Sequence, residues 1–400
     1  MSFTAETLER RELQGEPDWL RQRRRAALAD YQRLPMPSRT DEEWRRTDIT
    51  GLNPANFARF EHANGAAPQP APKLPAGVIY EPLAAAAASH AKLVEPFLFT
   101  LLHHDRDRFA ALHSAFFTGG SFLYVPDGVT VGEPILGRHL SHQAGTSVLP
   151  HTLIVAGRNS HFNYLDEYID EGDDEGEAYR SGSAEIFAGE GSEVGYVSLQ
   201  KWGRNAWHFG DLRARVEKDA TLKLFNVTLG GRFSKNRVEA SLVGPGATAE
   251  LKGIYFASGE QFFDFHTLQD HQVGNTTSDL LFKGALQDTA RTVYAGLIKI
   301  EKHAARSDAY QANRNLVLSD KAKATSIPML EIDNNDVRCT HGATVGPVDP
   351  NHLFYLRSRG IPESTAKRML IQGFFGQVLD RIPFEEARTL VENELEARIG

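Results

Sequence analysis

A recurring turn pattern most strongly constrains how this 400-residue chain can fold. A Gly, Asp or Asn is followed by small or polar residues and then by an alternating strand pattern, at intervals of 28, 27 and 28 residues. The pattern begins at Gly191, Asp219, Gly246 and Gly274. Two out-of-step copies begin at Asp288 and Asp320. A fixed period of this size, built from strands without helices, indicates a β-solenoid whose stacked coils bury one another's inner faces.

A β-sandwich of regular hairpins is the alternative fold for the strand-rich region, Ser121 to Ile332. Hairpins favour Asn-Gly or Asp-Gly turns, and Asp127-Gly128 is the only such turn in this region. We therefore expect a mainly β protein with a solenoid core and helical regions on both sides. The expected parts are an N-terminal helical region with a linker at 1–118, a β-helix core at 119–346 and a C-terminal helical region at 347–400.

Helical patterns occupy both flanks of this core. The expected helices are 1–34, a short one carrying Trp44 after Thr40 or Asp41, 83–117, 351–359, 362–380 and one from Pro383 to the end. A stripe of Ala366, Met369, Leu370, Phe374 and Val378 is expected to be the apolar face of the second C-terminal helix. Residues 63–77, rich in Ala and Pro, are expected to be a linker.

Composition and absent motifs exclude several classes of protein. The net charge of −8 does not suit a general nucleic-acid binder. One cysteine forbids an internal disulfide, and no signal peptide or run of about 18 apolar residues is present, so a cytoplasmic location is expected. No phosphate loop occurs, and the segment 244–249, which imitates a dinucleotide fingerprint, leads into a strand. We expect no nucleotide to bind to this chain.

The segment Asp336–Gly346 holds the only cysteine, Cys339, with His341 two positions further on. In an extended chain these two side chains point to the same face. Thiolate and imidazole are both ligands for borderline or soft metals, but two ligands do not complete a site. A lone cysteine is most often a small buried apolar residue, and the pair taken alone is weak evidence for a metal site.

Other possible metal ligands in the sequence have simpler interpretations. His139 and His142 are expected to be solvated surface side chains, and His266 and His271 to lie on a packed or interfacial sheet face. The acidic run 170–177 does not have the ligand order of an EF-hand and is expected to be a solvated loop.

Several segments closely resemble the SufB/SufD family of iron–sulfur cluster assembly scaffolds. The segments are Glu42–Asp48, Tyr294–Ile300, Ala309–Ser319, Pro328–Asp333, Asp336–Gly346, Leu353–Ile361 and Gly373-Phe374. The SufB branch has Glu directly after the histidine and carries further cysteines. This chain has Gly342 there and no second cysteine, so it resembles the SufD branch.

The resemblance implies a right-handed parallel β-helix and a SufB–SufC–SufD complex. In it, SufC is the ATPase and docks on the C-terminal helical region, where the expected partner-binding residues are Leu353, Tyr355, Leu356, Met369, Leu370 and Phe374. It further implies that His341, with Cys339 as a second ligand or a structural neighbour, faces SufB, and that a transient iron–sulfur cluster or iron is shared with SufB. When alone, the chain could form a homodimer.

Two other functions remain compatible with the sequence. A β-helix enzyme acting on carbohydrates would need a carboxylate or basic cluster across neighbouring coils and would normally be secreted. A purely structural adaptor would hold SufC while His341 only packed against neighbouring side chains.

Overall fold

The computed structural model describes residues 3–11, 15–57, 59–61, 64–65, 73–172 and 176–399. Strand accounts for 41% and helix for 24%, so the expected mainly β class is confirmed. The helices are α1 (Ala5–Arg11), α2 (Asp18–Arg33), α3 (Leu83–Ser89), α4 (Ala91–Val94), α5 (Arg108–Phe116), α6 (Pro350–Ser358), α7 (Glu363–Leu379) and α8 (Glu385–Ile399), with 3₁₀ helices η1 (Glu42–Trp44) and η2 (Pro54–Phe57). No described helix is long and apolar enough to cross a bilayer.

Two sheets form the walls of the core. In spatial order, the nine-stranded sheet contains β1 (Asn64–Gly65), β4 (Ile135–Ser141), β7 (His161–Asp170), β10 (Glu193–Lys201), β12 (Thr221–Thr228), β14 (Thr248–Ala257), β16 (Thr277–Leu286), β18 (Asp308–Val317) and β20 (Arg338–Pro347). The eleven-stranded sheet contains β19 (Lys323–Ile332), β17 (Arg291–Ile300), β15 (Phe262–His271), β13 (Phe233–Leu242), β11 (Ala206–Val216), β9 (Ser183–Ala188), β6 (His151–Ala156), β3 (Ser121–Val125) and β2 (Ile79–Pro82), with β5 (Ser147–Val148) and β8 (Ala178–Arg180) alongside.

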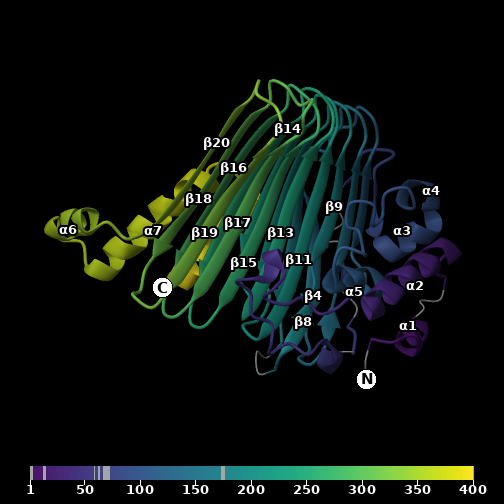
Figure 1. Ribbon diagram of the computed structural model, residues 1–400, viewed down its shortest axis with the longest axis horizontal. Coiled ribbons are helices and arrows are strands. Elements are labelled where there is room, and N and C mark those ends of the chain that lie inside the picture. Colours follow the sequence, from purple (N-terminus) through teal and green to yellow (C-terminus); the bar gives the residue numbers. More distant parts are fainter. Residues whose placement is uncertain are drawn as a thin grey trace.

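From β9 to β20, successive strands alternate between the two sheets, and each strand up to β18 pairs in parallel with the equivalent strand of the next coil. Glu193 of β10 is opposite Thr221 of β12, and Thr221 is opposite Thr248 of β14. This is a solenoid of about eight turns, as predicted, and parallel pairing rules out the hairpin sandwich. Figure 1 shows the coils stacked between helices at both ends of the chain.

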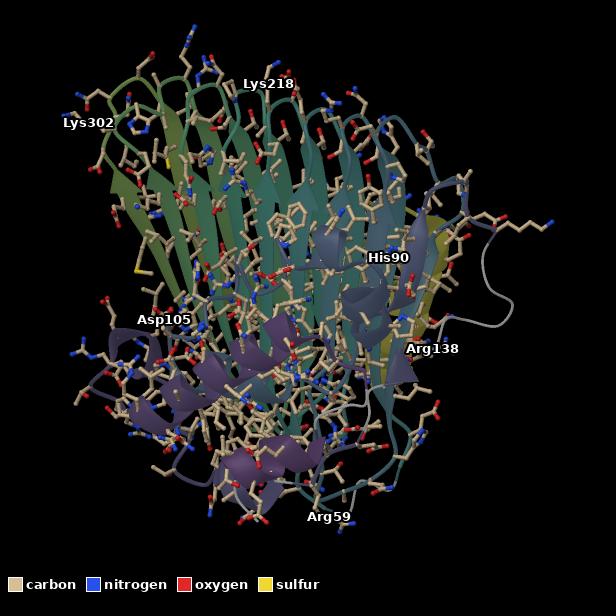
Figure 2. The ribbon with its side chains drawn as sticks, turned by 90° about the vertical axis from the view of Figure 1, so that its right-hand side faces the viewer. Arg59, His90, Asp105, Arg138, Lys218 and Lys302 are labelled. Atoms are coloured by element: carbon tan, nitrogen blue, oxygen red, sulfur yellow. The ribbon has the colours of Figure 1, made fainter. Side chains whose placement is uncertain are left out.

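The turn pattern of the sequence corresponds to one stacked row of turns. Gly191 and Asp219 have positive φ angles of 68° and 56°, which explains the preference for Gly, Asp and Asn. Each turn bonds to the next coil, since the Gly191 amide donates to the Lys218 carbonyl and the Asp219 amide to the Pro245 carbonyl. Lys218 and Lys302, in turns of different coils, lie at the same edge of the solenoid (Figure 2).

The out-of-step copies belong to the opposite row of turns. Asp288 also has a positive φ angle, 58°, but it precedes β17 of the eleven-stranded sheet. Its carboxylate accepts a hydrogen bond from the Gly259 amide of the preceding coil. The solenoid therefore has two rows of turns, and the turn pattern seen in the sequence combines members of both rows.

Alternate residues of each strand point into the lumen and fill it. Val194 of β10, Leu222 of β12 and Ala249 of β14 lie in register and are fully buried in one core cluster. Burying a Val or Leu side chain contributes about 1.5–3 kcal/mol, so stacking of coils supplies the stability that no single coil can supply.

The expected helices of the N-terminal half are shorter than predicted. The predicted helix 1–34 is two helices, because Gly15 has a φ angle of 93° and Pro17 is in an extended conformation before α2. The predicted helix 83–117 is interrupted between α4 and α5, where Pro96 lies and where Asp107 begins α5 by accepting hydrogen bonds from two amides. Most of the predicted linker 63–77 lies outside the described residues.

Of the C-terminal helices, α7 and α8 cover the outer face of the nine-stranded sheet. Asp349 caps α6 and Gly360, with a φ angle of 84°, follows its end, as predicted. On α7 the expected stripe is only partly correct, because Ala366 and Val378 are buried whereas Met369 is 44% exposed. The buried face of α7 instead includes Ile371 and Phe375, which pack on the strands.

The 42–48 segment is fixed to the outer face of the eleven-stranded sheet. Trp44 stacks on Phe109 of α5, with ring centroids 5.3 Å apart, and the Lys235 ammonium lies 4.5 Å from the Trp44 ring centroid. The Thr47 hydroxyl donates to the Asp264 carboxylate, which also accepts from Lys235 at 2.6 Å. These buried hydrogen bonds join Thr47 to Asp264 and Lys235, which lie far from it in the sequence.

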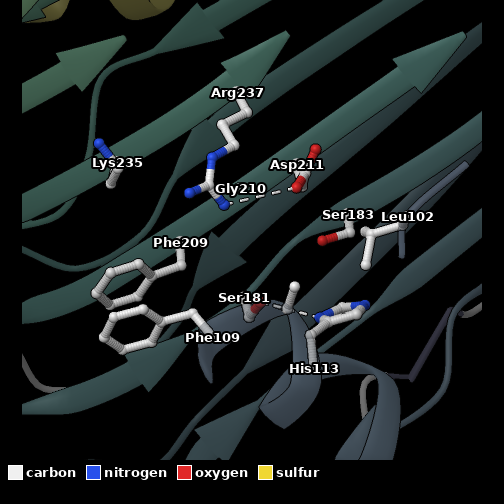
Figure 3. A pocket seen from close by; sticks show the side chains of 11 residues that line it. Leu102, Phe109, His113, Ser181, Ser183, Phe209, Gly210, Asp211, Lys235 and Arg237 are labelled. Atoms are coloured by element: carbon white, nitrogen blue, oxygen red, sulfur yellow. Dashed lines mark hydrogen bonds and ion pairs between the residues drawn. The ribbon is translucent and has the colours of Figure 1, made fainter. Parts of the chain in front are cut away.

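An ion cluster continues from this contact beneath α5. Arg237 donates to Glu43 at 2.7 Å and lies 2.6 Å from Asp107 (Arg237 is drawn in Figure 3). Burial opposes ionisation of Glu43, but attraction to Arg237 and Arg106 outweighs it and lowers the pKa of Glu43 to about 2. The cluster comprises five carboxylates, Glu43, Asp107, Asp211, Glu239 and Asp264, and four cations, Arg106, Arg213, Lys235 and Arg237.

This cluster has one more carboxylate than guanidinium and ammonium groups, and the pKa of one of its carboxyl groups is raised. Burial raises the pKa of Asp211 to about 8, against the attraction of Arg237 and with a further rise from Glu239. Asp211 lies on the wall of a small cavity of about 20 Å³ between α5 and the sheet (Figure 3).

We expect Gly284→Ala to reduce stability by about 1–3 kcal/mol, the usual cost of overpacking a filled core. A Cβ at Gly284 would lie 1.8 Å from the Tyr255 ring, whose hydroxyl donates to Asn315 at 2.6 Å. Urea unfolding measures the change. Gly342→Ala is the control, because no atom lies within 4 Å of its added Cβ. Equal losses in both variants would contradict the filled lumen.

We expect Asp211→Asn to change how stability depends on pH. The unfolded Asp releases its proton near pH 4 (about 3.9) and the folded one at about 8. The contribution of Asp211 to the free energy of unfolding is therefore fully present below about pH 4, and it declines as the pH rises towards 8. Relative to the unsubstituted protein, Asp211→Asn should gain up to about 1.4 kcal/mol per pH unit as the pH rises from about 4 to about 8, and the difference should then level off. Urea unfolding at several pH values tests this, with exposed Asp219→Asn as the control. Parallel stability curves would contradict it.

Candidate functional site

The two ends of the solenoid are closed differently. At the N-terminal end, β1 and β2 pair antiparallel with β4 and β3. At the other end, β20 and β19 are the last strands of their sheets, and each has a single neighbour, β18 and β17, among the described strands. Both are ten residues long. Long unpaired strand edges are templates for pairing with another chain.

Apolar side chains are exposed around this open end. They include Leu330 and Ile332 of β19 and Val345 of β20, exposed to 40%, 39% and 46%. The corresponding positions of earlier coils, such as Ile298 and Ile300 of β17, are fully buried because the next coil covers them. The last coil thus exposes a surface of the kind that the rest of the solenoid buries.

Cys339 and His341 both lie on β20, in the last coil. They are opposite Ala309 and Gln311 of β18, which are buried and face the lumen. The register therefore places Cys339 and His341 on one face, towards the lumen at its open end. Cys339 is half-buried against the cluster that contains Ile298, whereas His341 is exposed.

The electrostatics of the pair do not favour a resting thiolate. Burial raises the pKa of the Cys339 thiol, and the negative charge of Asp308 raises it further. Metal binding would have to displace this proton. Among the described residues, no group of three or more His, Cys, Asp or Glu side chains could hold a metal ion. Any metal at Cys339 and His341 would therefore need ligands from outside the described part of the chain.

Three other histidines that the sequence suggested as possible ligands lie in buried or surface positions. His139 was expected on the surface, but it lies fully buried in the lumen, 2.6 Å from the Asp166 carboxylate. The prediction for His139 was wrong because strand register, which a short motif does not reveal, decides which side a residue faces. His142 is half-exposed, 3.7 Å from Glu171, and His271 is buried on a packed sheet face, as expected. The acidic run 170–177 falls partly outside the described residues.

The helix α6 is separated from the solenoid and has no buried residue. It projects from the side of the molecule opposite α1–α5 (Figure 1). Tyr355 is 57% exposed, and Leu353 and Leu356 are half-buried. Of the expected partner-binding residues on α7, Met369 is exposed, while Leu370 and Phe374 are half-buried.

Phe354 was not among the expected partner-binding residues, yet it is 74% exposed and the most exposed large apolar side chain described. The signal was present in the run Leu353–Leu356. Four consecutive apolar or aromatic residues cover every side of a short helix, so one face has to remain unburied.

Two family models match this chain. The model described as "SUF system FeS cluster assembly, SufBD core domain" matches residues 139–374, and the model described as "SufBD protein N-terminal region" matches residues 59–136. Together they include most of the solenoid, the Cys339–His341 pair and most of α7.

Curated relatives agree with these models. The "Iron-sulfur cluster assembly protein SufD" of Bacillus subtilis is 30% identical over 96% of this chain and 95% of its own length. A SufBD family protein of Mycobacterium tuberculosis is 37% identical over 54% of this chain and 57% of its own. Another, from Staphylococcus saprophyticus, is 26% identical over 81% and 70%. With the solenoid, its open last coil and these matches, the chain belongs to the SufB/SufD family of iron–sulfur cluster assembly proteins.

Proposed function

We propose that this chain is the SufD-type subunit of a SufB–SufC–SufD complex. In this role it is a non-catalytic scaffold, and nascent iron–sulfur clusters form where its last coil meets SufB. The observation that carries the proposal is the open end of the solenoid, where His341 is exposed on β20, whose outer edge has no neighbour among the described strands.

The ligand count supports a shared site. Iron–sulfur clusters are held most often by four cysteine thiolates, and histidine can replace some of them. Cys339 is the only cysteine of the chain, so a partner must bring the remaining thiolates. His341 would act as a neutral imidazole ligand to iron, and Cys339 as a thiolate or as a packed neighbour. The iron or cluster is then a cargo shared with SufB.

The strand edges support docking at this end. Addition of a partner's strands to β19 or β20 would satisfy their unpaired backbone groups and cover Leu330, Ile332 and Val345. When SufB is absent, the same edges of a second copy could pair, which would give a homodimer.

The ATPase is assigned to SufC, since the chain contains no phosphate loop. SufC would dock on α6 and the neighbouring part of α7, through Leu353, Tyr355, Leu356, Met369, Leu370 and Phe374, together with Phe354. Movement of the SufC pair during ATP hydrolysis would be transmitted to the two solenoids and would expose or close the seam between them.

His341→Ala should leave the complex assembled but lower the yield of cluster on reconstitution with iron and sulfide, because one iron ligand is lost. The yield is measured from the visible absorbance of the purified complex. His161→Ala is a matched control, since His161 is exposed on β7, far along the solenoid, near Glu193. An unchanged yield would remove His341 from the site and favour the structural adaptor.

Phe354→Ala should weaken SufC binding by about tenfold or more, the effect of removing an aromatic interface anchor. Thermal stability should stay unchanged, because α6 has no buried residue. Isothermal titration with SufC measures the affinity. His352→Ala is the control, as His352 is exposed two residues away, about 200° around the helix. Equal affinities for both variants would place the SufC site elsewhere.

A further inference from the structure

A groove lies on the outer face of the eleven-stranded sheet, outside the lumen and away from α6. Its volume is about 640 Å³. One wall is the 42–47 segment, and the floor consists of β15, β17 and β19. The purple N-terminal segment beside β11 and β15 marks that wall in Figure 1. Neither Cys339 nor His341 lines this groove.

The floor of the groove is apolar and regular. Leu268, Leu297 and Met329 lie in register on three successive strands, which places their side chains in a row across the sheet. A second row contains Ala295 and Ile327. Neighbouring strands are about 4.8 Å apart. An α-helix advances about 5.4 Å per turn, so apolar residues at i, i+3 or i+4 and i+7 match such a row.

The rim of the groove is acidic. It has four carboxylates, from Glu42, Glu43, Glu239 and Glu331, and two guanidinium groups, from Arg46 and Arg106. Arg106 is already paired with Glu43 and Glu239, at 2.7 Å and 2.8 Å. Lys299 of β17 is opposite Glu331 and lies 2.6 Å from Glu301. Glu42 and Glu331 are exposed, and neither has a cationic group within ion-pair distance among the described residues. They stand on different elements that line the groove, η1 and β19, where they would attract a cation.

The groove also reaches the open end of the solenoid. Met329 and Glu331 belong to β19, whose outer edge is unpaired, and Leu330 lines both the groove and the end of the lumen. A chain that pairs with β19 therefore has its flanking residues at the mouth of the groove.

We propose that the groove binds a short amphipathic helix of the subunit that docks on the open end, with apolar residues at i, i+3 or i+4 and i+7 and a Lys or Arg beside them. This inference rests on the proposed end-on docking. The apolar rows hold the helix, and Glu42 and Glu331 select its basic residues. The groove thereby adds specificity for the partner that strand pairing alone, which uses backbone groups, does not supply.

Photo-crosslinking in the purified SufB–SufC–SufD complex tests this. The crosslinker p-benzoylphenylalanine replaces Met329, which is 36% exposed in the groove. In the control it replaces Thr325, which is exposed on the same strand and the same face but does not line the groove. We expect a crosslink from position 329 to a helical, Lys- or Arg-containing segment of SufB, at least fivefold stronger than from position 325.

Charge reversal is the second arm of the experiment. The double variant Glu42→Lys, Glu331→Lys should lower the crosslink from position 329 at least threefold, while Glu190→Lys, at an exposed turn residue away from the groove, should not. Equal crosslinks from 325 and 329, a crosslink only to SufC, or no effect of charge reversal would overturn the groove proposal. Size-exclusion chromatography distinguishes a failure of the groove proposal from a failure of the proposed function. If the unsubstituted subunits did not assemble, the result would count against the proposed function itself.

Discussion

Unpaired backbone at the last coil is the constraint on which the rest of this structure depends. In a parallel solenoid, the amide and carbonyl groups of each strand bond to the strands of the next coil. The strands of the final coil therefore always keep one edge of backbone groups without partners. At the N-terminal end the chain covers the corresponding edges with two antiparallel strands. At β19 and β20 no described strand does so. The same coil exposes Leu330, Ile332 and Val345, and it carries Cys339 and His341.

The N-terminal segment contributes both to stability and to the outer surface near this coil. Glu43, Trp44 and Thr47 point inward, where they bond to the ion cluster and pack on α5. Glu42 and Arg46 point outward and form the wall of the groove. Buried ion pairs are costly to break one partner at a time, so the cluster fixes the position of this wall with respect to the sheet. A rigid wall lowers the entropic cost of binding a partner helix.

The solenoid was predictable because the local chemistry of its turns marks its period. Features that depend on long-range packing were harder to predict from the sequence. Positive φ angles at stacked turns restrict the residue type, so Gly191, Asp219 and Gly246 revealed the period directly. The interruption between α4 and α5 was less visible, because the apolar residues of 83–117 suit either a helix or a loop packed on a core. His139 was misplaced because its side of the strand depends on register with β7.

The features of the candidate site also differ in whether the sequence could reveal them. The i, i+2 spacing was enough to place Cys339 and His341 on one face, and the apolar run on α6 could have revealed Phe354. No motif could reveal the groove, because it forms only when residues 42–46 meet strands that begin more than 200 positions later. The open coil itself is a consequence of where the strand pattern stops. A solenoid with identical coils would expose identical edges at any length, so specificity must come from side chains outside the backbone edge. In our proposal, the apolar rows of the groove and the carboxylates of Glu42 and Glu331 supply that specificity beside β19.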